Sequence, residues 1–492
     1  MTHNRYLAIL LFAAAAGCAA PTVEQQLIND AADGLGGRER VLAVRTLVLE
    51  GEGTQFNLGQ DMRPGASGQT FTVSGLKRQI DLAGHRMRTE LTRTPNFAFF
   101  QGPAPQPQVQ GLDGEVAYNV APNGNAARVT AQATGDRRAD FYHHPIVLVA
   151  AALAPGASVA NVRSEGAERL ADITTDEGMR LVMAVDESGR PTRIESRSYH
   201  ANLGDVTLST HFADYQENAG VMLPGHVRTK VDEFTTAEVR FPVQRVDAAI
   251  DDLAAPSAVT SAALPTPAAP NVVAEQVAPG VWLLAGQSHH SALVELSDHM
   301  LLIEAPQSEE RTLAAIARAR ELQPDKPLTK IVTTHHHFDH TAGIRAAVSE
   351  GLTIVTHSGN RAFFEEMAAR PHTIVADALS RNPKPVVVET VDDELVIEDP
   401  ARTVALYHVA GNPHSDTMLM VYLPAERVVI EVDAYSPASQ AHPYAANLLD
   451  NIVRRKLRVD RVVPLHGAIA PFADLVKHGA AQTEAFGFQL RR

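Results

Sequence analysis

The feature that most constrains this chain is a cluster of histidines within seven residues, Thr334-His335-His336-His337-Phe338-Asp339-His340. The cluster follows an apolar segment, LTKIVTT, which predicts a strand. Side chains alternate along an extended segment, so we expect His335, His337 and Asp339 on one side, with His340 joining them from the next turn. Three imidazoles and a carboxylate that converge form a ligand set for Zn²⁺ or a similar first-row ion. The alternative is a solvated polar turn.

Short apolar segments alternate with helical patterns in the last part of the chain. The expected strands include VWLLAG (281–286), ALVEL (292–296) and MLLIEA (300–305), and the expected helices are RTLAAIARARELQ (311–323) and TAGIRAAVSEG (341–351). This alternation is typical of an α/β domain.

The histidine cluster carries a resemblance to a known family. Its pattern H-x-H-x-D-H resembles the signature of the metallo-β-lactamase superfamily, which adds a distant His, an Asp and a last His at strand ends. His414, Asp433 and His466 stand in matching places over residues 272–492. The resemblance implies an αββα sandwich that holds two Zn²⁺ ions, although other first-row divalent ions are compatible. It implies the following ligands: His335, His337 and His414 for the first ion, Asp339, His340 and His466 for the second, and Asp433 as a bridge.

The sequence also suggests roles for other residues near these ligands. Glu304 stands where the family often has aspartate, and we expect a structural or supporting role for it. His336 is expected to turn away from the metals. A surface loop is the favoured interpretation for His289 and His290, with a role beside the substrate or the ligands as the alternative. Tyr435 is predicted to donate a hydrogen bond to an oxyanion, as a nearby tyrosine does in related lactonases; a packed aromatic is the alternative.

The part of the chain before residue 251 is predicted to be β-rich. A short helix is expected over 23–37, strands over 45–56 and 204–215, two strands over 179–199, and a Pro-rich loop over 101–111. Many strands with one early helix resemble the half-barrel domains of the lipoprotein-carrier type; the alternative is a spacer or shield. His143 and His144 precede a proline and an apolar run, and we assign them no function.

Four segments follow from these patterns. They are a leader at 1–17, a β-rich domain at 18–251, a linker at 252–270 and a hydrolase-like α/β domain at 271–492. The linker is rich in Pro and Ala, which predicts a semi-rigid connection. The predicted fold class is therefore α/β, a C-terminal αββα sandwich preceded by a β-rich domain that resembles a half-barrel.

The leader ends in Ala15-Ala16-Gly17-Cys18, which holds the only cysteine of the chain. Small residues before a cysteine resemble the lipobox of a bacterial lipoprotein signal. That resemblance implies cleavage before Cys18, lipidation of its thiol and an anchor in a lipid bilayer of the cell envelope. Ala19 stands where aspartate would mark the inner membrane, which favours the outer membrane, facing the periplasm. The alternative is a plain secretory signal with an incidental cysteine.

Composition excludes several classes of protein. The net charge of −14 disfavours nucleic acid as the main partner, because phosphate binding needs a basic face. No apolar run reaches the roughly 18 residues of a membrane-spanning helix. No nucleophile elbow, phosphate-binding loop or dinucleotide fingerprint is present. The sequence leaves the oligomeric state open.

The predicted function is metal-dependent hydrolysis of a small molecule. A hydroxide shared by the two ions and oriented by Asp339 would attack an ester, lactone, thioester or amide. One alternative is β-lactam hydrolysis, which Asp433 disfavours because dedicated enzymes of that kind usually have cysteine or serine there. Another is a membrane-anchored protein that binds a lipid or other ligand, with a secondary metal domain. A redox role with iron is less favoured.

Overall fold

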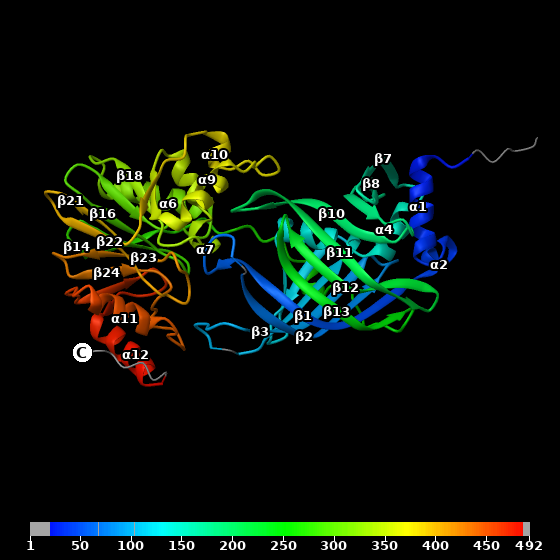
Figure 1. Cartoon of the computed structure of the whole chain (residues 1–492), viewed down its shortest axis with the longest axis horizontal. Coiled ribbons are helices and arrows are strands. Elements are labelled where there is room, and N and C mark those ends of the chain that lie inside the picture. Colours follow the sequence, from blue (N-terminus) through cyan, green and yellow to red (C-terminus); the bar gives the residue numbers. More distant parts are fainter. Residues whose placement is uncertain (1–19, 67, 103, 486–492) are drawn as a thin grey trace, which may run out of the picture.

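The computed structural model describes residues 20–66, 68–102 and 104–485, in which two β-containing regions lie side by side (Figure 1). The leader and Cys18 lie outside the described residues. In the part of the chain that the structure describes, no helix is long and apolar enough to cross a membrane.

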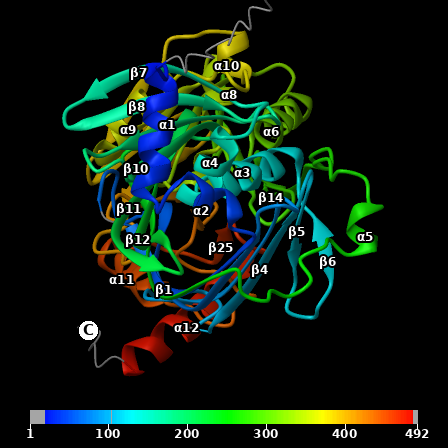
Figure 2. The same cartoon turned by 90° about the vertical axis from the view of Figure 1, so that its right-hand side faces the viewer.

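The N-terminal region is a large antiparallel sheet with the order β6-β5-β4-β3-β2-β1-β13-β12-β11-β10-β9-β8-β7. Its strands are β1 (Thr46–Asp61), β2 (Gly68–Asp81), β3 (Arg86–Pro95), β4 (Gln106–Asp113), β5 (Val116–Val120), β6 (Ala126–Arg128), β7 (Ser158–Glu165), β8 (Glu168–Thr174), β9 (Arg180–Val185), β10 (Pro191–His200), β11 (Gly204–Asn218), β12 (Val221–Val231) and β13 (Phe234–Val246). The order begins and ends on different strands, so the sheet is open. It curves around a group of helices (Figure 2).

These helices are α1 (Val23–Gly34), α2 (Arg38–Ala43), α3 (Ala131–Tyr142) and α4 (Pro145–Ala152). Leu27 of α1 and Leu148 of α4 are fully buried against the sheet in one core. Only the first of the four helices was expected. The apolar run after His144 forms α4 because Pro145 occupies its first turn, where the missing N–H costs nothing.

The prediction of a Pro-rich loop over 101–111 is wrong in its second half, because β4 begins at Gln106. Pro107 pairs with Thr92 of β3, whereas pairing with β5 begins only at Val109. Pro107 therefore lies at an edge position, where the absent N–H leaves no bond unmade.

The C-terminal region consists of two facing sheets with helices outside, in a mixed α/β arrangement. The first sheet contains β14 (Val273–Ala278), β15 (Val281–Ala285), β16 (Ser291–Glu295), β17 (Met300–Ile303), β18 (Leu328–Val332), β19 (Thr353–His357) and β20 (Val388–Val391). The second contains β21 (Glu394–Glu398), β22 (Thr403–His408), β23 (Leu419–Leu423), β24 (Val428–Glu431), β25 (Arg461–Pro464) and β26 (Ala470–Pro471).

Three apolar layers hold these sheets and helices together. Val294 and Val421 belong to the layer between the sheets. Ile316 and Phe364 belong to the layer that packs helices on the first sheet, and Leu448 to the layer on the second. The helices are α6 (Glu309–Leu322), α7 (Phe338–Thr341), α8 (Ile344–Ser349), η1 (Ser358–Asn360), α9 (Arg361–Ala369), α10 (Ala378–Arg381), α11 (Ala445–Arg454) and α12 (Phe472–Ala485).

The segment between the two regions contains a short helix, α5 (Ser257–Thr260). It lies against the N-terminal sheet: Arg128 Nη1 donates to the carbonyl of Ala262 at 2.7 Å, and the amide of Ala255 donates to Asp113. Val259 is 1% exposed. This segment is therefore packed on the sheet over part of its length.

Candidate metal centre

The candidate ligands come from loops at one edge of the C-terminal sheets. Strand β18 ends at Val332, and the chain then enters α7, whose N-cap is His337. Asp433 follows β24 and His466 follows β25. These two strands are parallel, so their carboxyl ends lie at the same edge. His414 comes from the connection between β22 and β23.

The structure brings four side chains together in what we call the first ligand group. Its members are His335, His337, His414 and Asp433, whose ligand atoms all lie within 4.8 Å of one another. All four are buried. The rings of His335 and His337 have centroids 4.4 Å apart. These are the three imidazoles predicted for the first ion, together with the predicted bridge.

A second ligand group lies beside the first. Its members are His289, Asp339, His340 and His466, whose ligand atoms also lie within 4.8 Å of one another. It contains the three residues predicted for the second ion and adds His289. The side chains of Asp339 and His466 are 40% and 24% exposed, so the site is open to solvent on this side.

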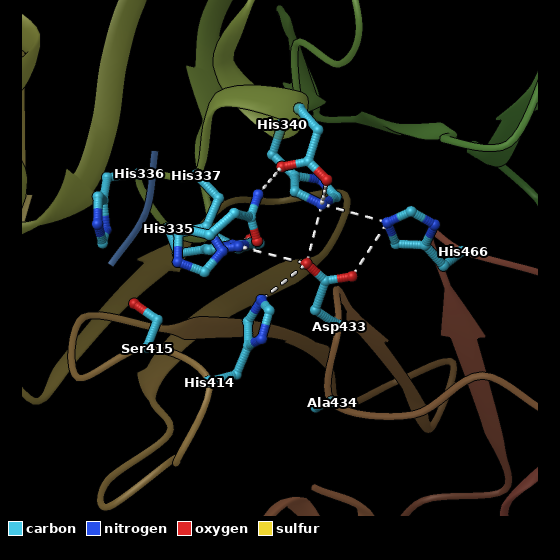
Figure 3. A network of polar contacts seen from close by, with 12 residues as sticks. His335, His336, His337, His340, His414, Ser415, Asp433, Ala434 and His466 are labelled. Atoms are coloured by element: carbon cyan, nitrogen blue, oxygen red, sulfur yellow. Dashed lines mark hydrogen bonds and ion pairs between the residues drawn. The ribbon is translucent and has the colours of Figure 1, made fainter. Parts of the chain in front are cut away.

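Asp433 lies between the two groups, as Figure 3 shows. Its Oδ2 is 3.0 Å from His414 Nε2 and 2.9 Å from His340 Nε2, and its Oδ1 is 3.0 Å from His466 Nε2. One carboxylate thus faces imidazoles of both groups. Asp433 has φ +57°, a left-handed conformation that aspartate tolerates better than most residues.

Backbone carbonyls fix which ring nitrogen carries the proton in two of the histidines. Nε2 of His337 is 2.9 Å from the carbonyl of Asp61, and Nδ1 of His466 is 3.1 Å from the carbonyl of Ser288. A carbonyl only accepts, so each of these nitrogens donates, and the other ring nitrogen keeps its lone pair. In both rings the free lone pair is therefore available to a metal ion.

Glu304 lies behind His340, as a supporting role requires. It is fully buried, and its Oε1 accepts the amide of Thr334 at 2.6 Å. Its Oε2 is 3.4 Å from Nδ1 of His340. A carboxylate behind a ligating imidazole orients the ring and raises its basicity.

The electrostatics of the site come from close pairing of imidazoles with carboxylates. Burial opposes ionisation of Asp433, but His340, His466 and His414 outweigh it and hold the pKa of Asp433 well below its usual value. Burial likewise disfavours the charged form of His340, but Asp433 and Asp339 raise its pKa well above the usual value. Both carboxylates are therefore ionised at neutral pH.

The residues fit a metal centre on their own geometry. Nδ1 of His337 is buried and has no hydrogen-bond partner among the described residues. Nε2 of His340 and Nε2 of His466 face each other at 3.2 Å, and they lie 2.9 Å and 3.0 Å from the carboxylate of Asp433. Buried imidazole nitrogens that point at one another and at a shared carboxylate are satisfied by cations between them.

Two predicted neighbours of the ligands have other contacts. His336 is buried between Phe363 and His337, with its ring 4.9 Å from that of His337, and its Nδ1 is 3.5 Å from Thr417 Oγ1. Nδ1 of His290 accepts the amide of Gly286 at 3.3 Å. Neither belongs to a ligand group. His336 thus turns away, as expected.

The oxyanion role predicted for Tyr435 needs correction. Its side chain is fully buried in the apolar layer against the second sheet, with its ring 5.4 Å from His442 and 5.8 Å from His478. The backbone turns at Asp433, so residues two apart point in different directions. Tyr444 instead lies beside a candidate ligand: its ring is 5.2 Å from that of His414, and its hydroxyl donates to the carbonyl of Ala98.

His289 also differs from its favoured interpretation as a surface-loop residue. Its Nε2 is 3.2 Å from Asp339 Oδ2, and its ring is 3.9 Å from that of His466. Its only sequence signal was its place in a loop before a strand, next to a second histidine. Tyr444 had no signal at all, because a loop residue far from the motif is placed by tertiary packing.

Comparison with known proteins agrees with this fold. Residues 285–434 match the sequence model of the Metallo-beta-lactamase superfamily, a range that includes every member of both ligand groups except His466. The C-terminal region therefore has the metallo-β-lactamase fold, preceded by a β-rich sheet.

Solved structures of metallo-β-lactamases resemble this chain at low identity. DIM-1 metallo-β-lactamase is 19% identical, with 44% of this chain and 99% of that chain covered and a TM-score of 0.35. FIM-1 from Pseudomonas aeruginosa, in its mono-zinc form, is 16% identical over 44% and 96%, with a TM-score of 0.34. A metallo-β-lactamase from Hirschia baltica is 17% identical over 42% and 96%, with a TM-score of 0.33.

The family match and the His/Asp cluster together support a metal-dependent hydrolase. They imply a divalent metal, for which zinc is the typical ion with such ligands.

Proposed function

We propose that this protein hydrolyses an ester, lactone, thioester or amide bond of a small molecule with the help of two Zn²⁺ ions. The observation that carries the proposal is the arrangement of two adjacent ligand groups with Asp433 between them. The first group would hold one ion and the second group the other. Two ions so placed lower the pKa of water and polarise a carbonyl or leaving group.

The chain's own residues prepare the site for this reaction. Asp339 lies on the open side, where its carboxylate can orient the attacking water. Burial opposes its ionisation, but His340 and a hydrogen bond from His289 hold its pKa well below the usual value. Asp339 therefore remains a hydrogen-bond acceptor at neutral pH. The carbonyls on His337 and His466 keep those rings in the tautomer that leaves a lone pair for the metal.

A substrate panel tests the proposal. An aryl ester, several lactones, a glutathione thioester, nitrocefin and an aryl sulfate are assayed with and without a chelator, beside Asp433→Ala. We expect turnover of one acyl class, lost in both controls, from protein that binds two metal ions per chain. Nitrocefin turnover equal to that of the best ester would favour β-lactam hydrolysis instead. Turnover that survives both controls would contradict the metal mechanism.

A second candidate function concerns the N-terminal region, which contains a cavity of about 310 Å³. Apolar side chains such as Leu49 and Phe241 line it together with polar and charged ones such as Arg78 and Asp140. This cavity favours binding of an amphipathic ligand such as a fatty acid, with the metal domain as a secondary feature. Binding of a fluorescent fatty acid, displaced by its natural counterpart and unchanged in Asp433→Ala, would support this function. Absence of binding would contradict this second function and leave hydrolysis as the proposed function.

We further propose that Cys18 carries a lipid anchor that holds the protein at the outer membrane, facing the periplasm. The lipobox-like residues before it support this proposal. Metabolic labelling with a radioactive fatty acid would mark the wild-type protein and leave Cys18→Ser unlabelled. Labelling of both proteins, or of neither, would contradict it.

A further inference from the structure

The hairpin between β1 and β2 reaches from the N-terminal sheet to the metal centre. In Figure 1 it approaches α7, which carries two of the candidate ligands. The carbonyl of Met62 accepts the amide of Asp416 at 2.7 Å, which joins the hairpin to the loop after His414. Gly59 and Asp61 are buried. The hairpin is therefore seated on the C-terminal region.

Gly59 explains how the hairpin can lie so close. It has φ +79°, and a Cβ built on it would lie 2.2 Å from the ring of Phe338. That distance is far below van der Waals contact, and the conformation itself favours glycine. A side chain at this position would be strained by the positive φ and would displace either the Phe338 ring or the hairpin.

Two contacts of this hairpin fall directly on candidate ligands. The carbonyl of Asp61 accepts the proton on Nε2 of His337 at 2.9 Å. The amide of Gln60 donates from Nε2 to Oδ1 of Asp339 at 2.7 Å. His337 belongs to the first ligand group and Asp339 to the second. The N-terminal region thus touches both groups.

Each contact has a definite chemical effect. The Asp61 carbonyl leaves the lone pair of His337 on Nδ1, the nitrogen for which the described residues offer no hydrogen-bond partner. Gln60 contacts Oδ1 of Asp339 at 2.7 Å, and His289 contacts Oδ2 at 3.2 Å. With both oxygens held, the plane of the carboxylate is fixed. Each oxygen has two lone pairs, so one remains free for a cation or a water.

We propose that the β1–β2 hairpin of the N-terminal region is a working part of the metal centre, in which Gln60 positions Asp339 and the Asp61 carbonyl positions His337. This inference rests on the proposed two-metal hydrolase. Gln60 is a positioning residue, because it acts through Asp339. The N-terminal region then does more than space or shield the C-terminal region: it completes the site.

Metal titration of purified Gln60→Leu, which keeps the size of the side chain but removes the amide, tests the inference. Removing a partner behind a metal ligand typically costs about 10- to 100-fold in metal affinity. We expect such a loss at one of the two sites in competition with a chromogenic chelator, while the other site keeps its wild-type affinity. The visible absorption of Co²⁺ at the weakened site should change, and kcat should fall more than KM.

Two further variants make the result decisive. Gln69 lies on the other strand of the same hairpin, and Gln69→Leu should keep wild-type metal affinities. Gly59→Val should displace the hairpin and weaken both sites, because it removes both contacts. Far-UV circular dichroism verifies that each variant is folded.

The outcomes separate this inference from the function on which it rests. Two wild-type metal sites with unchanged affinities and Co²⁺ spectrum in Gln60→Leu would overturn the inference alone. A wild-type protein that binds fewer than two ions would overturn the two-metal function and the inference with it. Equal losses in Gln60→Leu and Gln69→Leu would show a general effect of the hairpin on folding and would also overturn the assigned role of Gln60.

Discussion

Histidines are buried in both regions of the molecule, but in contrasting surroundings. In the N-terminal sheet, His143 hydrogen-bonds Thr210 at 2.9 Å and Ser196 at 3.0 Å, and His144 has no hydrogen-bond partner among the described residues. In the C-terminal region, the imidazoles of the ligand groups face Asp433 and Asp339. Burial is common to His143, His144 and most of the imidazoles of the ligand groups, whereas His340 and its neighbours in those groups also contact carboxylates directly.

The pKa values show the consequence of this difference. Burial lowers the pKa of His143 to about 4 and that of His144 to about 3, so both stay neutral at ordinary pH. Asp140, the carboxylate that acts on His143, is paired with Arg78 at 3.0 Å. At His340, Asp433 and Asp339 reverse the effect of burial. A buried imidazole becomes a candidate for metal chemistry when several converge on a carboxylate.

The largest effect is expected from removing the charge that the two ligand groups share. Asp433→Asn keeps the shape of the side chain but loses the negative charge that faces four imidazoles. We expect fewer than two bound ions and a loss of about 10³-fold in kcat/KM, the several kcal/mol that a metal supplies. Metal analysis and steady-state kinetics measure both.

Asp460→Asn is the matched control, because Asp460 is exposed and pairs with Arg427. It should bind two ions and turn over at the wild-type rate. Full activity in Asp433→Asn would show that the negative charge facing the imidazoles of the ligand groups does not set them apart functionally from His143 and His144.

A smaller effect is expected behind His340. In Glu304→Gln, the amide oxygen can still accept from Thr334, but the NH₂ group would face Nδ1 of His340. The ring would then carry its proton on Nε2, the nitrogen directed at Asp433. We expect a loss of about 10- to 100-fold in metal affinity. An unchanged affinity by chelator competition would mean that Glu304 only supports the backbone.

The burial of His144 in the N-terminal region should make the stability of the protein depend on pH. The folded-state pKa of His144 is about 3, below the value of about 6.5 in an unfolded chain. Between these values the unfolded chain binds the proton and the folded chain does not, so stability falls as pH decreases from about 6.5 toward 3. The slope is at most about 1.4 kcal/mol per pH unit for this histidine.

Urea unfolding of His144→Leu with a chelator present measures this contribution. We expect the variant to lose less stability than wild type between pH 7 and pH 5. At neutral pH it should gain about 1–3 kcal/mol, because an unpartnered polar ring is removed. His143→Leu should instead be destabilised at neutral pH, since Thr210 and Ser196 lose their partner. Identical pH slopes in wild type and His144→Leu would contradict the assignment.

The smallest effect on catalysis is expected at His336. Its ring packs between Phe363 and the ring of His337, its nitrogens belong to neither ligand group, and burial lowers its pKa to about 3. His336→Leu should bind two ions and change kcat/KM by less than about threefold, because leucine keeps an apolar contact with His337 and no candidate ligand is removed. A loss as large as that in Asp433→Asn would show that position in the motif matters more than the direction of the side chain.

The sequence allowed much of the C-terminal region to be predicted. Apolar segments of four to six residues marked β15, β16 and β17, and the helical pattern at 311–323 marked α6. The candidate ligands were also accessible, because metal chemistry needs particular residue types and the strand ends set their spacing. Their roles as ligands remain predictions. Local patterns did not reveal α3 and α4, whose packing inside the curved sheet depends on strands distant in the sequence.

What the sequence determined by itself was the chemistry of the site, since residue types and their order near strand ends are local properties. Only the tertiary structure decided which side chains complete the site. It placed Tyr444, and not Tyr435, beside His414. It also placed His289 in the second ligand group and brought Gln60 to Asp339, from which it is separated by 279 positions in the chain. Contacts between residues so far apart leave no periodicity or spacing to read. They arise because the β1–β2 hairpin, with a glycine where Phe338 leaves no room for a side chain, fits against α7.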